Sequence, residues 1–476
     1  MILQRFHDEN LAQTSYLIGC AATGEALVVD ASRDAGQYIR AAASENVRIT
    51  HITETHIHAD YVSGSRELAA KTGAQLYLSG EGGPEWEYAF ADVDGAVLLK
   101  DGDSFGVGSI LIEAVHTPGH TPEHLSFLVT DGATADRPIG ILTGDFVFVG
   151  DVGRPDLLEK VAGQAHTMEA SARTLFRSLQ RFRAYPDYLQ ILPGHGAGSA
   201  CGKGISAVPS STVGYELRFN WAFSITGEDE FVDAVLAGQP EPPAYFAQLK
   251  KVNRAGPRVL GGLPQPQRLP GAGLAAVLEA DACVIDARGT EQYGSGHIPG
   301  TLGIPLDRSF STWAGWLIPY DCDVYLIADE SDAVEAAKDL AMIGLDRVAG
   351  WFDTDVLEAW RNGGRELETV RRITSRELAA RMRADDVKLL DVRGRVEWET
   401  AHIPGAENIP VGLLEEHLDR IPRDSPVVVH CQSGARSAIA ASVLRVHGFG
   451  NVANLDGGLG EWQAAGLPIE RATGAV

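Results

Sequence analysis

THIHADY, residues 55–61, is the most informative stretch of the sequence. It brings two imidazoles and a carboxylate, those of His56, His58 and Asp60, within five residues of one another. The β-branched, alternating segment 47–53 before it predicts a strand that ends where this cluster begins. In α/β sheets, ligands bind beyond the carboxyl ends of strands, and closely spaced His and Asp side chains are metal donors. The stretch therefore predicts a metal site on a strand-end loop.

Three later strands lead in the same way to a donor side chain. Apolar strands predicted over 110–115, 139–142 and 188–192 run into His120, Asp145 and His195, respectively. Pro and Gly on both sides of His120 restrict the backbone, so this ring is held in place. Because a folded sheet can bring strand-end loops together, we expect all four loops to contribute to one site.

The composition predicts a soluble protein of several domains. A length of 476 residues corresponds to about three domains. The formal charge of −24, with no run of Lys or Arg, would repel a phosphate backbone, so no nucleic-acid partner is expected. No apolar run approaches the ~18 residues of a membrane span, and the N-terminus lacks a basic or apolar signal region. We therefore expect a cytoplasmic protein with no membrane partner; homo-oligomerisation is left open.

The second half of the chain contains an internal repeat. Residues 286–305 recur at 391–410 with a constant offset of 105, which indicates two copies of one domain. Each copy alternates short apolar strands with helices and should form a small α/β domain with a parallel sheet. Asp391, Arg393 and His402 have counterparts in the other copy, so we interpret them as architectural. The Pro- and Gly-rich segment 253–270 is the predicted linker between this half and the first.

The five cysteines are scattered, odd in number and include no Cys-x-x-Cys pair, so we expect reduced thiols: Cys20, Cys201, Cys283, Cys322 and Cys431. Cys431 opens the segment CQSGAR, residues 431–436, between a predicted strand and a helix over 437–447. Backbone N–H groups at a helix N-terminus stabilise a thiolate and can cradle a persulfide. The predicted cradle is formed by Gln432, Ser433, Gly434 and Ala435.

Arg436 ends this segment and can attract an anion such as sulfite or thiosulfate. Cys431 is thus the predicted nucleophile. In the first copy the equivalent loop is shorter, has no cysteine and runs into the acidic segment 329–332. Acidic side chains would repel an anionic sulfur species, so the first copy is predicted to lack this activity.

The order His-x-His-x-Asp, Pro-Gly-His, Thr-Gly-Asp and Pro-Gly-His resembles the metallo-β-lactamase fold over residues 1–252. The segments GRPDL, 153–157, and GHGAGSACGK, 194–203, resemble its persulfide dioxygenase branch. The two repeats, 271–366 and 373–476, resemble rhodanese sulfurtransferases. The resemblance implies an α/β fold class: a metallo-β-lactamase αββα sandwich followed by two rhodanese-like domains with parallel sheets.

The resemblance also implies the site residues. By matching motif, one ferrous ion per chain, Fe(II), would be bound by His56, His120 and Asp145. Two imidazoles and a carboxylate leave positions on iron for dioxygen and a low-molecular-weight thiol persulfide, which would react to sulfite. The side chains orienting these ligands, or holding a second metal, would be those of His58, Asp60 and His195. The candidate substrate-binding residues are Cys201, Tyr215 and Arg218. For Cys201, a small buried thiol is the alternative.

Two alternatives remain. A dinuclear zinc hydrolase of the glyoxalase II type shares the fold and most ligands, but there a further His follows the His-x-His-x-Asp motif. This chain has Tyr61 instead, and a phenol is a poor ligand for Zn²⁺, which favours a single metal. Tyr61 is also a departure from the pattern of many persulfide dioxygenases. The second alternative is a sulfur carrier or sensor in which the metal domain has no activity.

Overall fold

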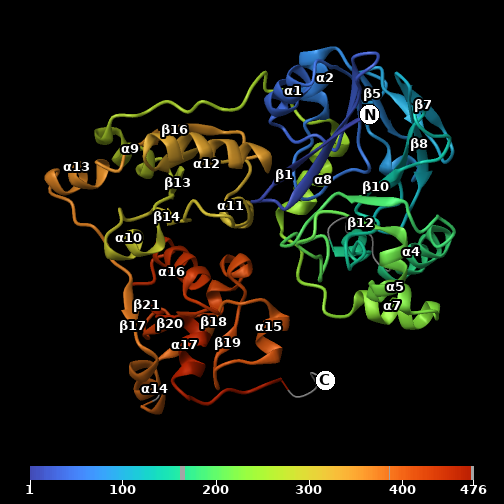
Figure 1. The fold of residues 1–476 in the computed structure, drawn as a ribbon. Coiled ribbons are helices and arrows are strands. Elements are labelled where there is room, and N and C mark those ends of the chain that lie inside the picture. Colours follow the sequence, from blue (N-terminus) through green and yellow to red (C-terminus); the bar gives the residue numbers. More distant parts are fainter. Residues whose placement is uncertain (161–166, 385, 473–476) are drawn as a thin grey trace. The chain divides into compact units, whose positions relative to one another are not determined.

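The computed structural model describes residues 1–160, 167–384 and 386–472 (Figure 1). The chain divides into two units: Met1–Leu263 with Ala341–Gly344, and Pro264–Leu340 with Leu345–Val476. The division falls within the segment 253–270, although helix α8, Tyr245–Ala255, continues past the first residues of that segment. Asn253 on this helix is buried, and its amide donates to the carbonyls of His58 and Tyr61 at 2.7 Å each.

The first unit contains two six-stranded sheets. The first sheet is ordered along the chain: β1 (Ile2–Asp8), β2 (Gln13–Cys20), β3 (Glu25–Val29), β4 (Arg48–Thr53), β5 (Gln75–Ser79) and β6 (Val97–Leu99). Strands β1, β2 and β3 are antiparallel, and β3 to β6 are parallel. Strand β4 corresponds to the strand predicted over 47–53, and it pairs with β3 on one side and with β5 on the other.

The second sheet has the order β12-β11-β10-β9-β8-β7. Its strands are β7 (Ser104–Val107), β8 (Ile110–His116), β9 (Leu125–Asp131), β10 (Gly140–Gly144), β11 (Gln190–Pro193) and β12 (Ser211–Thr212). All neighbours are antiparallel except β10 and β11, which are parallel. Because β10 and β11 run the same way, the residues that follow them emerge at the same edge of the sheet.

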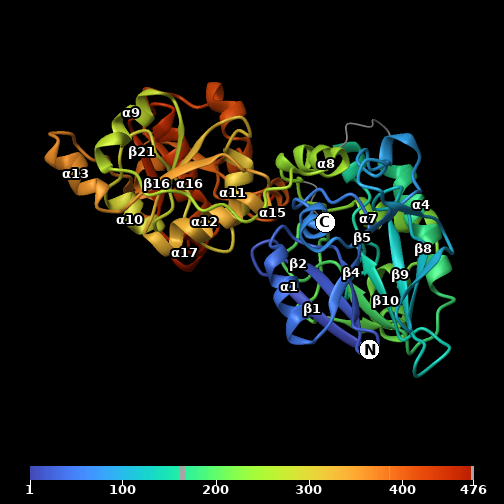
Figure 2. The same ribbon diagram turned by 90° about the horizontal axis from the view of Figure 1, so that it is seen from above.

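Helices cover the outer faces of both sheets. They are α1 (Ala35–Ser44), α2 (Ser65–Thr72), η1 (Pro84–Trp86), α3 (Leu157–Lys160), α4 (Met168–Phe182), α5 (Val213–Phe219), α6 (Trp221–Ser224), α7 (Glu228–Leu236) and α8. One apolar cluster fills the space between the sheets, a second lies under α1 and α2, and a third lies under α4 and α7. Figure 2 shows this order from α1 through the sheets to α4. The layers form the expected αββα sandwich.

The second unit contains two parallel sheets, one for each copy of the repeat (Figure 1). The first copy has β13 (Cys283–Asp286), β14 (Leu302–Gly303), β15 (Val324–Ile327) and β16 (Val348–Phe352), in the order β14-β13-β15-β16. Its helices are η2 (Gly271–Gly273), α9 (Leu274–Glu279), α10 (Thr290–Ser295), α11 (Phe310–Leu317), α12 (Glu330–Met342) and α13 (Val356–Asn362).

The second copy has the order β17-β21-β20-β18-β19. Its strands are β17 (Arg371–Ile373), β18 (Lys388–Asp391), β19 (Glu407–Asn408), β20 (Val427–His430) and β21 (Val452–Leu455). Its helices are α14 (Ser375–Arg383), α15 (Arg395–Thr400), η3 (Val411–Leu413), η4 (Glu415–Arg420), α16 (Ala435–Val446) and α17 (Gly458–Ala464). The predicted fold class is confirmed for both halves of the chain.

The residues shared by the two copies make the same buried contacts in each. The Arg288 guanidinium donates to both carboxylate oxygens of Asp286, at 2.8 and 2.6 Å. In the second copy Arg393 pairs with Asp391 in the same way, at 2.9 and 2.6 Å. Such bidentate pairs fix geometry as well as energy. The pairs fix the turns that follow β13 and β18, as expected for residues with an architectural role.

Candidate functional site

Asp30 fixes the loop that carries His56 and His58. It follows β3 with a φ of 55°, a left-handed conformation that short polar side chains tolerate better than most. Its carboxylate accepts the backbone N–H of Thr55 at 2.7 Å and the ring N–H of His58 at 3.1 Å. The buried loop is therefore held from the neighbouring strand rather than by its own residues.

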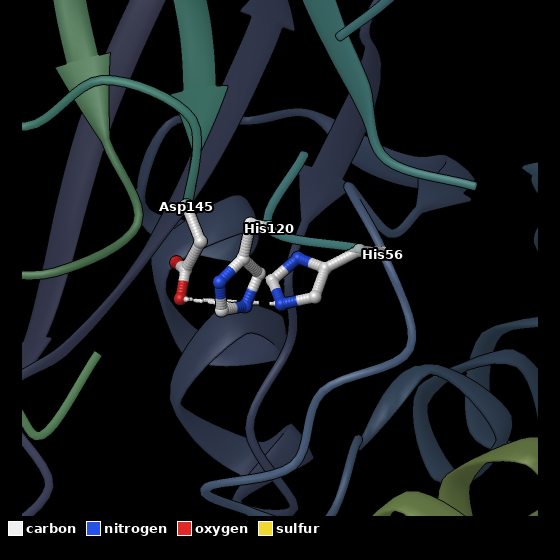
Figure 3. Close-up of side chains that lie close together, drawn as sticks. All are labelled: His56, His120 and Asp145. Atoms are coloured by element: carbon white, nitrogen blue, oxygen red, sulfur yellow. Dashed lines mark ion pairs between the residues drawn. The ribbon is translucent and has the colours of Figure 1, made fainter. Parts of the chain in front are cut away.

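His56, His120 and Asp145 converge at the strand-end edge of the sandwich (Figure 3). Their donor atoms all lie within 4.8 Å of one another. Oδ2 of Asp145 lies 3.5 Å from Nε2 of His120 and 4.0 Å from Nε2 of His56, and the three side chains are buried. The structure thus brings together the three residues predicted as metal ligands.

The hydrogen bonds of the rings direct their lone pairs into this site. Nδ1 of His120 donates to the carbonyl of Arg154 at 3.0 Å. Nδ1 of His56 lies 2.9 Å from the hydroxyl of Thr55, which itself donates to Asp30. With Nδ1 protonated, each neutral ring leaves Nε2 as a metal donor.

Burial keeps these imidazoles neutral. Desolvation, followed by the neighbouring histidines, holds the pKa of His56 well below its usual range. Desolvation also lowers the pKa of His120, although Asp145 opposes it. Burial would raise the pKa of Asp145, but His195, His120 and His58 outweigh it and hold that pKa below the usual value. The set presents two neutral imidazoles and one carboxylate, the protonation states that metal binding requires.

The unpaired carboxylate oxygens fit a cation. Among the residues that the structure describes, neither oxygen of Asp145 has a hydrogen-bond partner, and neither does Oδ2 of Asp60. A buried carboxylate without donors is costly unless it is paired or coordinates a metal. The donor set is therefore of the kind that holds a metal ion.

A second group of donors adjoins the first. Nε2 of His195 lies 3.2 Å from Oδ2 of Asp60 and 3.3 Å from Oδ1 of Asp145. Donor atoms of Asp60, His195 and Cys201 lie within 4.8 Å of one another, and all three residues are buried. Burial, with the negative charges of Asp145 and Asp60, raises the pKa of the Cys201 thiol well above its usual value. Cys201 therefore lies in the site itself, as a buried, protonated thiol.

In the second copy, Cys431 lies at the end of β20 and against the N-terminus of α16. Its Sγ accepts the backbone N–H of Gly434 at 3.1 Å and lies 3.5 Å from the hydroxyl of Ser437. Gly434 has a φ of 102°, a conformation that favours glycine, and this turn directs the N–H at the sulfur. Gly458 is also constrained, because a Cβ there would lie 2.4 Å from the carbonyl oxygen of Cys431.

These donors favour the thiolate. Burial by itself raises the pKa of Cys431, but hydrogen bonds from the Ser437 hydroxyl and from the N–H groups of Ser437, Ser433 and Gly434 outweigh it. The pKa of Cys431 is therefore lowered from its ordinary value. A thiolate held by backbone N–H groups is a nucleophile, and the same groups can hold a persulfide.

Helix α16 begins at Ala435, two residues before the predicted start at 437. Arg436 therefore lies in the first turn of the helix, and its guanidinium is paired with both carboxylate oxygens of Glu397, at 2.6 and 2.8 Å. Among the predicted cradle residues, Gln432 accepts a 3.4 Å hydrogen bond from Arg393 through its side-chain oxygen. Attraction of an anion by Arg436 stays a prediction, and it would compete with Glu397.

Residues 9–195 match the Metallo-beta-lactamase superfamily, and residues 374–465 match the Rhodanese-like domain family. A crystal structure of a metallo-beta-lactamase from Staphylococcus aureus is 43% identical to this chain, with a TM-score of 0.69. The similarity covers 74% of this chain and 99% of that one. The chain belongs to the metallo-β-lactamase superfamily.

Two curated relatives match separate parts of this metallo-β-lactamase-superfamily chain. A hydroxyacylglutathione hydrolase from Methylobacterium is 31% identical over 179 residues, 38% of this chain and 60% of that protein. A sulfurtransferase from Allochromatium vinosum is 41% identical over 101 residues, 21% of this chain and 94% of that protein. The chain therefore joins a metallo-β-lactamase-fold metalloenzyme to a rhodanese sulfurtransferase domain. Within 1–160, 167–384 and 386–472, no helix is both long and apolar enough to cross a membrane.

Tyr61 does not replace a ligand in this superfamily member. Its hydroxyl donates to the carbonyl of Asp30 at 3.2 Å, and its ring packs on His58 at a centroid distance of 4.5 Å. Desolvation and nearby carboxylates, Asp30 first, raise its pKa well above the usual value, so the phenol stays protonated. Tyr61 thus packs against His58 and is not itself a donor. The additional donor beside Asp60 and His195 is Cys201.

The structure does not bring Tyr215 and Arg218 into either donor group. Tyr215 is 53% exposed on α5 and packs on Phe219. The Arg218 guanidinium donates to the carboxylate of Asp187 at 2.9 Å and to the carbonyl of Gly214. A role in substrate binding stays a prediction for both residues.

His124 and Asp30 are positioning residues that the sequence analysis did not identify. Nε2 of His124 accepts the backbone N–H of Asp145 at 3.1 Å, and its Nδ1 lies 2.8 Å from the hydroxyl of Thr117. Its ring stacks on His56 at 5.1 Å. Burial lowers the pKa of His124 to about 3, so it stays neutral and keeps an acceptor nitrogen. The sequence signal available for His124 was its position directly before the apolar strand β9.

Replacing His124 with phenylalanine is expected to weaken metal binding by roughly 10- to 100-fold, the usual cost of losing a group that orients a metal ligand. The ring would still pack on His56, but the N–H of Asp145 would lose its acceptor. Competition with a chelator measures the affinity. His51→Phe is a matched control, because His51 stacks on Tyr77 and Phe105 outside the site. Equal affinities in the two variants would contradict the role assigned to His124.

Proposed function

We propose that this protein is an iron-dependent persulfide dioxygenase coupled to sulfur transfer. The first domain would convert a low-molecular-weight thiol persulfide, R–S–SH, dioxygen and water into the thiol, sulfite and two protons. The observation that carries the proposal is the donor set of His56, His120 and Asp145, two neutral imidazoles and a carboxylate. Non-haem ferrous oxygenases use this type of set, in which three protein ligands leave positions open for dioxygen and substrate.

Ferrous iron held by these three residues would supply the activation of dioxygen. The chain's own residues would bury the reacting sulfur and orient the metal ligands. Nε2 of His195 lies 3.2 Å from Oδ2 of Asp60 and 3.3 Å from Oδ1 of Asp145, so His195 would help to hold both carboxylates in place.

The rhodanese domain would act on the same sulfane sulfur. The Cys431 thiolate attacks the outer sulfur of R–S–SH, so that the S–S bond of the persulfide breaks, the thiol leaves and Cys431 becomes a persulfide. Sulfite then attacks the outer sulfur of that persulfide, forming thiosulfate and returning the thiolate. The reverse sequence starts from thiosulfate. Both directions use the N–H groups of Ser433 and Gly434 to hold the sulfur.

Loading the protein with different metals tests the proposal. We expect protein prepared without oxygen to bind one ferrous ion per chain and, with glutathione persulfide, to consume one dioxygen for each sulfite formed. Zinc-loaded protein is the control and should consume none. Coenzyme A persulfide in parallel would compare thiol carriers. Iron-loaded protein that takes up no dioxygen with either persulfide would refute the proposal.

A dinuclear hydrolase is the second candidate, favoured by the adjoining donors Asp60, His195 and Cys201. Asp145 lies between both groups and could contribute to each. This candidate predicts two zinc ions per chain and hydrolysis of a glutathione thioester without dioxygen. Metal counting together with thioester hydrolysis separates the two functions.

A further inference from the structure

Two cysteines lie side by side in the first copy of the repeat, away from both sites described above. Cys283 is the first residue of β13, and Cys322 lies just before β15, the strand that pairs with β13 in parallel. Sγ of Cys322 accepts the backbone N–H of Cys283 at 3.2 Å. Both cysteines are free and only partly buried. Reactants in solution can therefore reach them.

The surroundings of Cys283 favour its protonated thiol. Burial, followed by a hydrogen bond with the Cys322 side chain, raises the pKa of Cys283. The carboxylates of Asp281 and Glu415 act in the same direction. Sγ of Cys322 contacts the backbone nitrogen of Cys283, so the two side chains are adjacent across the paired strands, as a disulfide requires.

The pair is separate from the sulfur-transfer machinery. It lies where β13 and β15 begin, whereas Cys431 follows the carboxyl end of β20 in the other copy. The loop of the first copy that corresponds to the Cys431 loop lies at the opposite ends of the same strands. Oxidation of the pair would therefore not need Cys431.

We propose that Cys283 and Cys322 form a redox-active pair that closes to a disulfide when it meets a persulfide or a low-molecular-weight disulfide. The Cys322 thiolate attacks the outer sulfur of R–S–SH, the thiol leaves, and Cys322 carries the sulfane sulfur. Cys283 then attacks the Cys322 sulfur, its proton is lost, and hydrosulfide leaves. The two cysteines are oxidised, and the sulfane sulfur is reduced to sulfide.

With glutathione disulfide the same two displacements release two glutathiones instead. Only the choice of a persulfide as reactant rests on the proposed function. Failure of the dioxygenase assay would thus leave the reaction with glutathione disulfide to be tested by itself.

The experiment uses the full-length chain with Cys431→Ser, so that sulfur transfer does not contribute. Reduced protein is exposed to glutathione disulfide or to glutathione persulfide, blocked with an alkylating agent and mapped by mass spectrometry. We expect a cross-link between the peptides of Cys283 and Cys322, a mass decrease of about 2 Da for the pair, and one sulfide released per chain with the persulfide. Cys20→Ser on the same background is the matched control and should behave like its parent.

The Cys283→Ser variant tests the order of the steps. It should retain a glutathione adduct or an added sulfur on Cys322 and release no sulfide, because the second thiol is missing. Intact-mass titration of the unmodified pair needs no variant and so remains informative if the substitution impairs folding. The proposal is overturned if Cys322 is modified but no cross-link forms with Cys283 present, or if neither cysteine reacts.

Discussion

Replacing Asp145 with alanine is expected to remove the metal and to reduce sulfite formation by at least about 1000-fold, since even groups that only orient metal ligands are worth roughly 10- to 100-fold. The reason is that Asp145 is the carboxylate of the set and lies within 4.0 Å of both imidazole nitrogens. Metal content and dioxygen uptake with glutathione persulfide measure the two effects.

Two further variants make this result specific. Asp136→Ala removes an exposed carboxylate from the same unit and should keep both metal and activity. Asp145→Asn keeps the shape of the side chain and removes its charge, so it should also bind metal poorly if the carboxylate is a ligand. Full metal content in Asp145→Ala would exclude this carboxylate from the centre.

Replacing Cys431 with serine is expected to reduce sulfur transfer from thiosulfate to cyanide by roughly 1000-fold or more, because the nucleophile is lost. Dioxygen uptake by the first domain should persist in this variant, with an altered ratio of sulfite to thiosulfate. Cys20→Ser is the matched control and should retain both activities. Persistence of sulfur transfer without Cys431 would place the nucleophile elsewhere.

The pH dependence of Cys431 alkylation tests the hydrogen bonds to the Cys431 sulfur. Ser437 lowers the pKa of Cys431, so the thiolate persists to lower pH than for an ordinary cysteine. In Ser437→Ala the pKa should rise, and the alkylation rate of Cys431 should reach its plateau at a higher pH. An unchanged profile would show that the backbone N–H groups alone are sufficient.

The sequence was sufficient to predict the four donor loops because each follows an apolar strand with a polar side chain directly after it. The internal repeat could also be predicted from the sequence, because matching residues of the two copies are separated by a constant offset. Strands β1, β5, β6 and β7 were not predicted, since their short or mixed segments carry little periodicity. The αββα fold class did not depend on these strands, because it was predicted from the resemblance of the ligand motifs to those of the metallo-β-lactamase fold.

The supporting residues could not be predicted in the same way. Asp30 and His124 act by binding backbone N–H groups of residues 25 and 21 positions away in the chain. Such partners leave no local pattern in a sequence. Cys201 joins Asp60 and His195 because the loop after β11 folds back on the site, and Arg436 meets Glu397 because α16 starts early. These outcomes follow from tertiary packing rather than from residue spacing.

The first rhodanese-like copy passes from β15 to α12 through only two residues, Ala328 and Asp329, whereas four residues separate β20 from α16. The shorter turn lacks the left-handed glycine and the succession of amides that surround Cys431. A cysteine introduced at Asp329 would thus lack the environment that makes such a thiol reactive. Regaining activity would require lengthening the turn as well as changing a codon, so point mutation alone gives this copy no simple evolutionary route back to sulfur transfer.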